Sequence, residues 1–82
     1  MKLKKNIAIS ESGFIFNPEI GTSFTTNSLG VAILKQLKEK TSLDKIKDSI
    51  VKNYDIDPIT CEKDLDDFLR IVNQYNLLEE QT

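Results

Sequence analysis

The sequence of 82 residues contains no histidine and only one cysteine, Cys61. Histidine is the usual general base and the commonest metal ligand, so its absence excludes the familiar Ser-His and Cys-His catalytic pairs. A single cysteine can form neither an internal disulfide nor a common zinc site. The three glycines, Gly13, Gly21 and Gly30, lie too far apart to form a phosphate-binding loop. We therefore expect a protein that is not an enzyme and that needs no cofactor or metal.

Long hydrophobic runs are missing as well. No stretch approaches the roughly 20 residues of a membrane-spanning helix, and the apolar patch near the N-terminus is too short for a signal peptide. These absences predict a cytoplasmic protein that does not associate with membranes. With 39% hydrophobic and 29% charged residues, the composition is that of an ordinary globular chain, and the length predicts a single domain over residues 1–82.

Charge is distributed unevenly along the chain. Residues 1–54 contain nine lysines and five acidic residues, a balance of +4. Residues 55–82 contain eight acidic residues against Lys63 and Arg70, a balance of -6, so the net charge is only -2. The simplest interpretation is that solvated faces of the molecule differ in sign.

The first third of the chain has the alternating pattern and turn residues of short β-strands. The pattern predicts three strands, at residues 6–10, 14–17 and 22–26. The pair Ser12-Gly13 indicates a tight hairpin turn, and residues 17–21 contain the Pro and Gly of a second turn. The third strand is rich in Ser and Thr, and we expect Phe24 to supply its contact with the core.

The rest of the chain has the apolar spacing of helices. The spacing predicts three helices, at about residues 28–40, 42–54 and 58–75. Asn27 is a suitable N-cap for the first, and Thr41 with Asp44 three residues later resembles a capping box for the second. Asp57–Pro58 is a strong start signal for the third, because Pro favours the first helical position and Asp caps it. Asn76 tolerates the left-handed conformation that ends many helices.

This order, with all strands before all helices, indicates an α+β fold in which helices pack on one face of a small antiparallel sheet. The closing "LLEE" at residues 77–80 is predicted to be a short extended segment. Three strands cannot close into a barrel, so the sheet is expected to keep at least one free edge.

The predicted third helix has a wide apolar stripe. At 100° per residue, its core-facing band consists of Cys61, Leu65, Phe68, Leu69 and Val72. A neighbouring flank carries Asp64, Asp67, Ile71, Gln74 and Tyr75. One interpretation is that the flank is the edge of a wide apolar core stripe beside a solvated acidic face. The other is that it is the wall of a groove that accepts an apolar ligand group. The position of Cys61 on the core band predicts a buried, unreactive thiol.

Four segments together resemble a known family, the PqqD-like proteins. They are "NSLGVAILKQL" from Asn27, "YDID" from Tyr54, "DLDDFLRIV" from Asp64 and "NLLEE" from Asn76. This family of peptide chaperones is also called the recognition element of ribosomally synthesised, post-translationally modified peptide pathways. The resemblance covers residues from about 6 to 78 and implies a winged-helix-like fold of three strands and three helices.

The resemblance also implies a non-catalytic function. Such proteins capture the leader of a precursor peptide and present it to a modifying enzyme, often a radical S-adenosylmethionine enzyme. The leader adds as a strand beside the third strand and packs against the third helix. Carried over by element, this places the peptide-binding residues at Thr22, Ser23, Phe24, Thr25, Thr26, Asp64, Asp67, Phe68, Ile71, Gln74 and Tyr75.

Two other functions fit a fold of this kind. A winged helix can bind DNA, but the helix that enters the major groove is normally basic. Here the predicted third helix carries Glu62, Asp64, Asp66 and Asp67 against Lys63 and Arg70, so nucleic acid is not the expected partner. The remaining alternative is a structural subunit of an enzyme complex that does not bind a leader.

Overall fold

The chain begins with a three-stranded antiparallel meander. In the computed structural model, which describes residues 2–79, the strands are β1 (Ala8–Ile9), β2 (Phe14–Asn17) and β3 (Thr22–Thr25), in the order β1-β2-β3. Ile15 in the central strand pairs with Ile9 on one side and with Phe24 on the other. The predicted meander is therefore confirmed, although β1 is shorter than expected and β3 ends one residue earlier.

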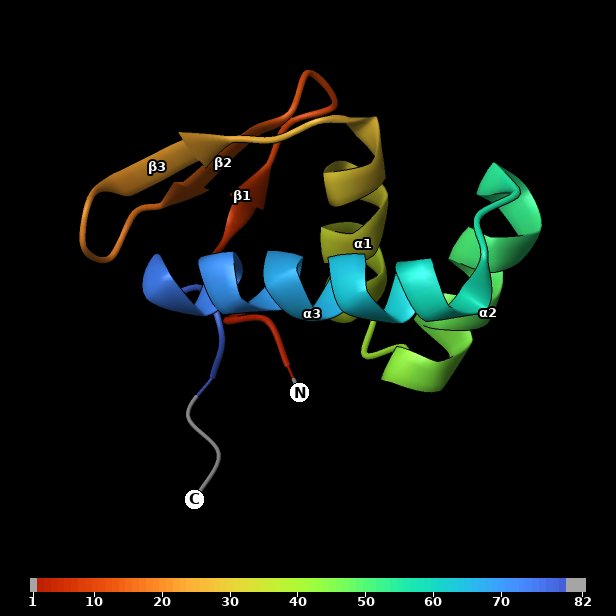
Figure 1. Cartoon of the computed structure of the whole chain (residues 1–82). Helices are drawn as coiled ribbons and strands as arrows, with labels where there is room; N and C mark the ends of the chain where they lie inside the picture. Colours follow the sequence, from red (N-terminus) through yellow and green to blue (C-terminus); the bar gives the residue numbers. More distant parts are fainter. Residues whose placement is uncertain (1, 80–82) are drawn as a thin grey trace.

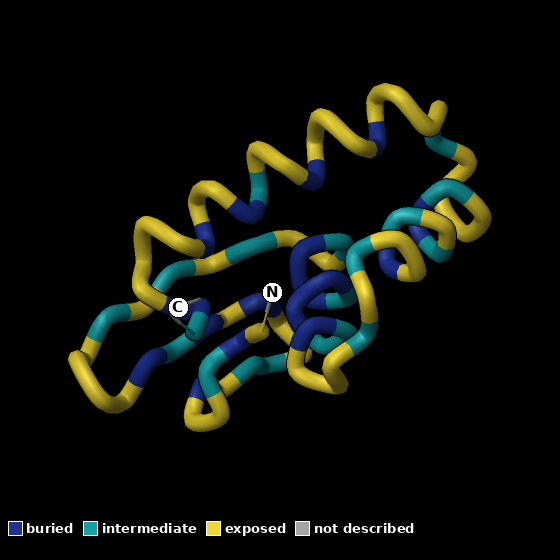
Figure 2. Tube along the Cα trace, turned by 90° about the horizontal axis from the view of Figure 1, so that it is seen from below, coloured by how far each residue is buried: buried dark blue, intermediate teal, exposed yellow. Residues whose placement is uncertain are grey.

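Three helices follow the sheet: α1 (Ser28–Lys38), α2 (Leu43–Tyr54) and α3 (Pro58–Gln74). Their order confirms the predicted α+β fold. In Figure 1, α3 crosses the width of the molecule below the sheet, with α1 behind it and α2 at its N-terminal end. After the rotation by 90° in Figure 2, β3 is the strand that runs beside α3. The last strand and the last helix are thus neighbours in space.

The helix ends agree with the sequence signals in most cases. The Asn27 side chain accepts a hydrogen bond from the Gly30 amide at 2.9 Å, and Asp57 caps α3 by accepting from two amides of its first turn. Asn76 has a φ of 59°, the left-handed conformation expected at the end of α3. The prediction for α2 was wrong by one residue, because Ser42 rather than Thr41 accepts the capping bond from the Lys45 amide.

Tight contacts hold the turn from β3 into α1. The Thr26 amide donates to the Gly13 carbonyl at 2.8 Å, so the backbone pairing between β2 and β3 extends one residue beyond the end of β3. Any Cβ at Gly30 would overlap the Thr26 side chain. Gly13 has a φ of 95°, and a Cβ there would overlap the Thr26 carbonyl oxygen. These two glycines let the hairpin, β3 and the start of α1 approach one another closely.

The core fills the space between the inner face of the sheet and the three helices. Figure 2 shows the buried positions recurring along the inward side of the helices, and β2 adds the buried Ile15 from the sheet. The core consists of Leu3, Ile7, Ile15, Ile33, Leu34, Leu37, Ile46, Ile50, Cys61, Leu65, Leu69, Val72, Leu77 and Leu78. Phe24 packs against this cluster from β3 and Phe68 packs against it from α3, as the periodicity of both segments predicted.

The two ends of the described chain lie side by side. Leu3 and Leu78 form an antiparallel bridge, the Lys4 amide donates to the Leu77 carbonyl, and the Glu79 amide donates to the Lys2 carbonyl, both at 2.8 Å. The closing segment is therefore extended as far as it is described, and Glu80 lies outside the described residues. No helix of the described part combines the length and the apolar character that crossing a membrane requires.

Candidate functional site

The outer edge of β3 is the first component of the site. Within residues 2–79, β3 pairs only with β2, so one row of its backbone groups has no strand beside it. The Thr26 amide faces β2, where it donates to Gly13. Because backbone groups of an antiparallel strand alternate between its two sides, the N–H and C=O groups of Ser23 and Thr25 face away from β2. This edge can accept a further strand.

The side chains of β3 separate into two faces. Ser23 and Thr25 are exposed, whereas Thr22, Phe24 and Thr26 are partly buried on the side of the helices. The Phe24 ring stacks on the ring of Tyr75, with centroids 4.8 Å apart and planes at 23°. The Thr22 Oγ1 atom is buried and has no hydrogen-bond partner among the described residues. β3 therefore presents a polar rim outward and an aromatic contact toward α3.

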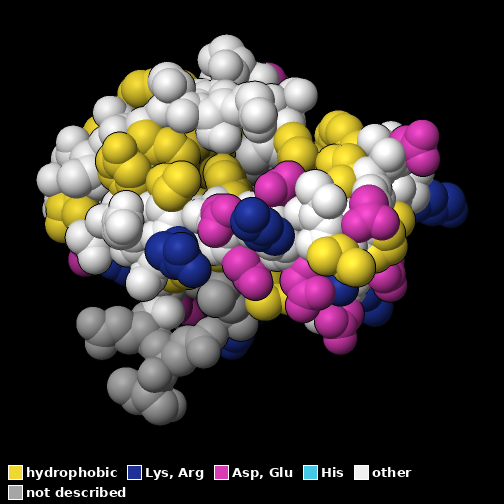
Figure 3. Space-filling model, in the orientation of Figure 1, with side chains coloured by type: hydrophobic (Ala, Val, Ile, Leu, Met, Phe, Trp, Pro, Cys, Tyr) yellow, Lys and Arg dark blue, Asp and Glu magenta, His cyan; other side chains and the backbone are white. Residues whose placement is uncertain are grey.

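The flank of α3 is the second component. Ile71 is 45% exposed and Tyr75 is 38% exposed, and the two lie one helical turn apart on the same side of the segment. Phe68 is half-buried, and Asp64, Asp67 and Gln74 are exposed. Figure 3 shows a hydrophobic patch between β3 and the C-terminal half of α3, with acidic side chains spread along α3. The structure thus brings the two groups of predicted residues to one face.

A hollow of about 220 Å³ lies along α3 toward its N-terminal half. It is lined by Asn27, Leu29, Gly30, Ile33, Ile50, Ile56, Cys61, Asp64, Leu65 and Phe68. Of these, only Asp64 and Phe68 were predicted as site residues. Leu29 and Ile56 were missed because an apolar residue in the sequence indicates a core position as readily as the wall of a hollow. Only the approach of α1 and α2 to α3 shows that these two residues border a hollow.

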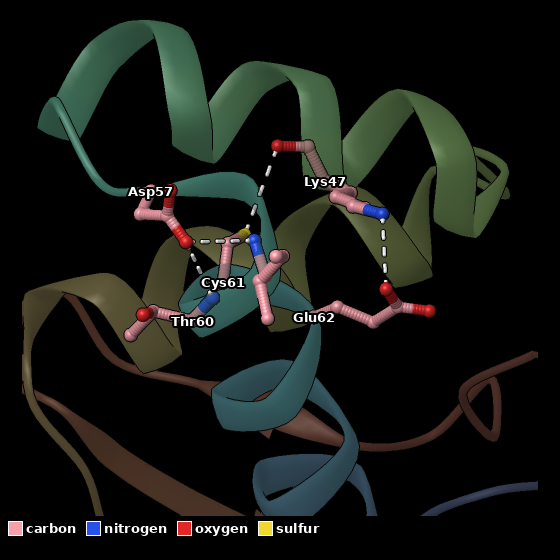
Figure 4. Close-up of polar contacts among 6 residues, drawn as sticks. Lys47, Asp57, Thr60, Cys61 and Glu62 are labelled. Atoms are coloured by element: carbon pink, nitrogen blue, oxygen red, sulfur yellow. Dashed lines mark hydrogen bonds and ion pairs between the residues drawn. The ribbon is translucent and has the colours of Figure 1, made fainter.

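Cys61 is a wall of this hollow and not a reactive group. It is 2% exposed, and its Sγ donates a weak hydrogen bond to the Lys47 carbonyl at 3.9 Å (Figure 4). Burial raises the pKa of the Cys61 thiol, against the opposing effect of the Lys47 ammonium group, and the nearby Asp64 and Glu62 carboxylates raise it further. Lys47 itself pairs with Glu62 at 3.4 Å. The predicted burial of the thiol is confirmed, and the direction of its pKa agrees with the low reactivity that the sequence predicts.

Asn17 fixes the far end of α3 beneath the sheet. Its side chain is fully buried, donates to the Asn76 carbonyl at 3.3 Å and accepts from the Glu19 amide at 3.1 Å. The bond to Asn76 connects the end of β2 with the turn that follows Tyr75. Asn17 therefore helps to hold Tyr75 beside Phe24. Sequence reasoning placed Asn17 at the end of a strand and the start of a turn, since nothing local indicates a partner 59 residues away.

The electrostatics of α3 suit neither a metal nor a nucleic acid. Among residues 2–79, the His, Cys, Asp and Glu side chains form no group of three that could hold a metal ion. The acidic residues of α3 are exposed, and its two basic residues are each bound or flanked by carboxylates, as in the Arg70–Asp67 pair at 3.8 Å. A helix with this charge repels phosphate.

The fold and the site together define a small α+β domain whose last strand keeps an open edge beside an apolar helix flank. A family model described as "Coenzyme PQQ synthesis protein D (PqqD)" matches residues 13–78, and the chain belongs to this PqqD family. A solved structure, "TbiB1 in Complex with the TbiA(beta) Leader Peptide", is similar with a TM-score of 0.87 and 29% identity, over 100% of this chain and 99% of that chain. No curated protein matches the sequence significantly.

These comparisons confirm the family resemblance and the fold predicted from the sequence. They give no support to the alternative of DNA binding. The individual site residues remain predictions, and the geometry of the β3 edge and the α3 flank supplies the argument for them.

Proposed function

We propose that this chain is a non-catalytic peptide chaperone that binds the leader region of a ribosomally made precursor peptide. The leader adds as a fourth strand to the edge of β3, packs against α3, and is presented to a modifying enzyme, for which a radical S-adenosylmethionine enzyme is the first candidate. The observation that carries this proposal is the open β3 edge beside an exposed apolar flank. Membership of the PqqD family and similarity to a protein in complex with a leader peptide support it.

Backbone pairing provides the first part of the affinity. The outward groups of Ser23 and Thr25 can form at most about four hydrogen bonds with an added strand. At a net value of roughly 0.5–1.5 kcal/mol each, they contribute about 2–6 kcal/mol. Association costs at least about 4 kcal/mol, so backbone pairing alone gives little binding.

Apolar side chains of the leader provide the rest. Ile71 and Tyr75 already expose apolar surface on one side of the groove, and the hollow beside Phe68 is large enough for an aliphatic side chain. Each leader side chain buried there contributes roughly 1.5–3 kcal/mol. Two such side chains and the backbone bonds together contribute about 5–12 kcal/mol, and the cost of association leaves at most about 8 kcal/mol, which corresponds to a dissociation constant of about 1 μM in the most favourable case.

The experiment that tests this function is a titration of the domain with a candidate leader peptide. Binding is measured by fluorescence anisotropy for the wild type and for Ile71→Ser, with Ile59→Ser as the matched control. Ile59 is an 80% exposed isoleucine on the same helix, but it lies about 120° away from Ile71 around the axis. We expect Ile71→Ser to weaken binding about tenfold and Ile59→Ser to leave it within about twofold.

A second pair of variants separates strand addition from simple apolar contact. Thr25→Pro removes the outward N–H of Thr25, whereas Lys45→Glu changes the charge of an exposed residue on α2. Strand addition predicts weaker binding for Thr25→Pro and unchanged binding for Lys45→Glu. Equal affinity of the wild type, Thr25→Pro and Ile71→Ser for the leader would contradict the proposed function.

A further inference from the structure

A second hollow, of about 330 Å³, lies at the C-terminal end of α1. It is lined by Lys2, Leu3, Lys5, Leu37, Lys38, Lys40 and Glu79. None of these residues belongs to the β3 edge, to the α3 flank or to the hollow beside Phe68. The molecule therefore has a separate basic concavity, which we call the lysine hollow, with four lysines around its rim and one glutamate.

The frame of the lysine hollow is held by backbone bonds. The bridge between Leu3 and Leu78 and the flanking amide bonds fix the first and last described residues against each other beneath the sheet (Figure 1). Lys38 is oriented as well, because its Nζ donates to the Ile7 carbonyl at 3.0 Å. The floor is apolar, since Leu3 and Leu37 are both buried. A ligand thus meets a preformed surface.

The charge of this hollow is largely uncompensated. The side-chain ion pairs of the described residues involve Lys35, Lys47 and Arg70, and none of them involves a lysine of the hollow. All four of these lysines are exposed. Four lysines against one glutamate around a single concavity create a local positive potential on a protein whose net charge is -2.

We propose that the lysine hollow docks an acidic segment of a partner protein. If the function proposed above holds, the modifying enzyme is that partner, and the separation of the two surfaces lets one domain hold leader and enzyme together. The basic residues of the hollow are all lysines, and its floor is apolar. The hollow has no arginine and no exposed aromatic side chain on which a base could stack. A short carboxylate-bearing segment fits this surface better than an extended polyanion, which the acidic α3 would repel.

The first test titrates the isotope-labelled domain with an unlabelled heptapeptide, Glu-Asp-Glu-Leu-Glu-Asp-Glu, and with its neutral counterpart, in which Gln and Asn replace the acids. Amide shifts are followed by NMR at about 50 mM and about 200 mM salt, because screening weakens such contacts. We expect the acidic peptide to shift amides of residues 2–5 and 37–40, with binding several-fold weaker at the higher salt. The neutral peptide is expected to produce no shift there.

Paired variants locate the contact. The double variant Lys5→Gln/Lys40→Asn removes two charges from the hollow, and Asn suits the left-handed backbone of Lys40, whose φ is 65°. The control, Lys45→Gln/Lys52→Gln, removes two charges from α2 and none from the hollow. We expect about tenfold weaker binding of the acidic peptide for the first and a change within about twofold for the control.

Leader binding at the β3 edge should be equal in both double variants, so failure of this proposal is distinguishable from failure of the proposed function. Three outcomes would overturn the docking proposal. They are equal losses in both double variants, shifts confined to β3 and α3, or tighter binding of a single-stranded DNA or of phosphatidylglycerol vesicles than of the acidic peptide.

Discussion

The ring of Phe24 in β3 stacks on the ring of Tyr75 at the end of α3, with 4.8 Å between their centroids. This contact connects the strand whose edge is open to the helix flank that remains exposed. It sets the separation between the two walls of the proposed groove, and an added strand must pass beside it. The geometry of the proposed leader site therefore depends on two residues that lie about fifty positions apart in the chain.

The first prediction concerns this aromatic pair. Phe24→Ala, Tyr75→Ala and the double variant form a thermodynamic cycle for the free energy of unfolding in urea. We expect a coupling energy of about 0.5–1.5 kcal/mol, the usual range for stacked aromatic side chains. Additive effects of the two substitutions would show that the rings do not stabilise each other.

The second prediction concerns Asn17. Asn17→Ala removes the bonds to Asn76 and Glu19 from a fully buried position, so the free energy of unfolding should fall by about 1–3 kcal/mol. Since Asn17 holds the end of α3, the amides after Gln74 should also exchange faster with solvent. The control Asn6→Ala alters an exposed asparagine and should change stability by less than about 0.5 kcal/mol. Equal stability of the two variants would contradict the role of Asn17.

The third prediction concerns the close approach of Thr26 to α1. Gly30→Ala should destabilise the protein by about 1–3 kcal/mol, although alanine is the better helix former, because its Cβ would overlap the Thr26 side chain. Adding Thr26→Ala removes the outer atoms of the Thr26 side chain and should recover part of the loss. The recovery is incomplete because the Thr26 Cβ that remains lies 3.0 Å from the new methyl position. Thermal unfolding of the three variants measures both effects. A stabilising effect of Gly30→Ala alone would refute the steric argument.

The fourth prediction concerns pH. Burial raises the pKa of the Cys61 thiol above its ordinary value of 9.0, so the folded state keeps this proton to higher pH than the unfolded state does. The contribution to stability is complete below about pH 9 and is lost as the pH rises through the pKa of the folded state. The difference in free energy of unfolding between wild type and Cys61→Ala should therefore shrink as the pH rises above about 9. A difference that is constant over this interval would contradict the raised pKa.

The order and type of the elements were predictable because their signals are local. Asn27 and Asp57–Pro58 identify two helix starts by side chains that bond amides within the next three residues. The start of α2 was misplaced because Thr41 and Ser42 are adjacent hydroxyl residues that can both cap a helix, and the acid at Asp44 favoured Thr41. Only the path of the backbone decides which of them faces the first turn.

The features that could not be predicted depend on distant contacts. Asn17 has its partner at Asn76, Leu3 has its partner at Leu78, and the hollow beside Phe68 forms where three helices meet. Periodicity placed Ile71 and Tyr75 on the flank of the core-facing band, but it could not distinguish a core fringe from a groove wall. The exposure of these two residues in the structure favours the groove wall.

The central claim is that a leader adds to β3 and packs on α3 at the same time. The most direct measurement is an NMR titration of the isotope-labelled domain with its cognate leader, followed by amide exchange of the complex. The account predicts that the amides of Ser23 and Thr25 shift together with those of residues 67–75, and that these two strand amides become protected in the complex. Absence of shifts at near-millimolar leader, or shifts that spare β3, would contradict it.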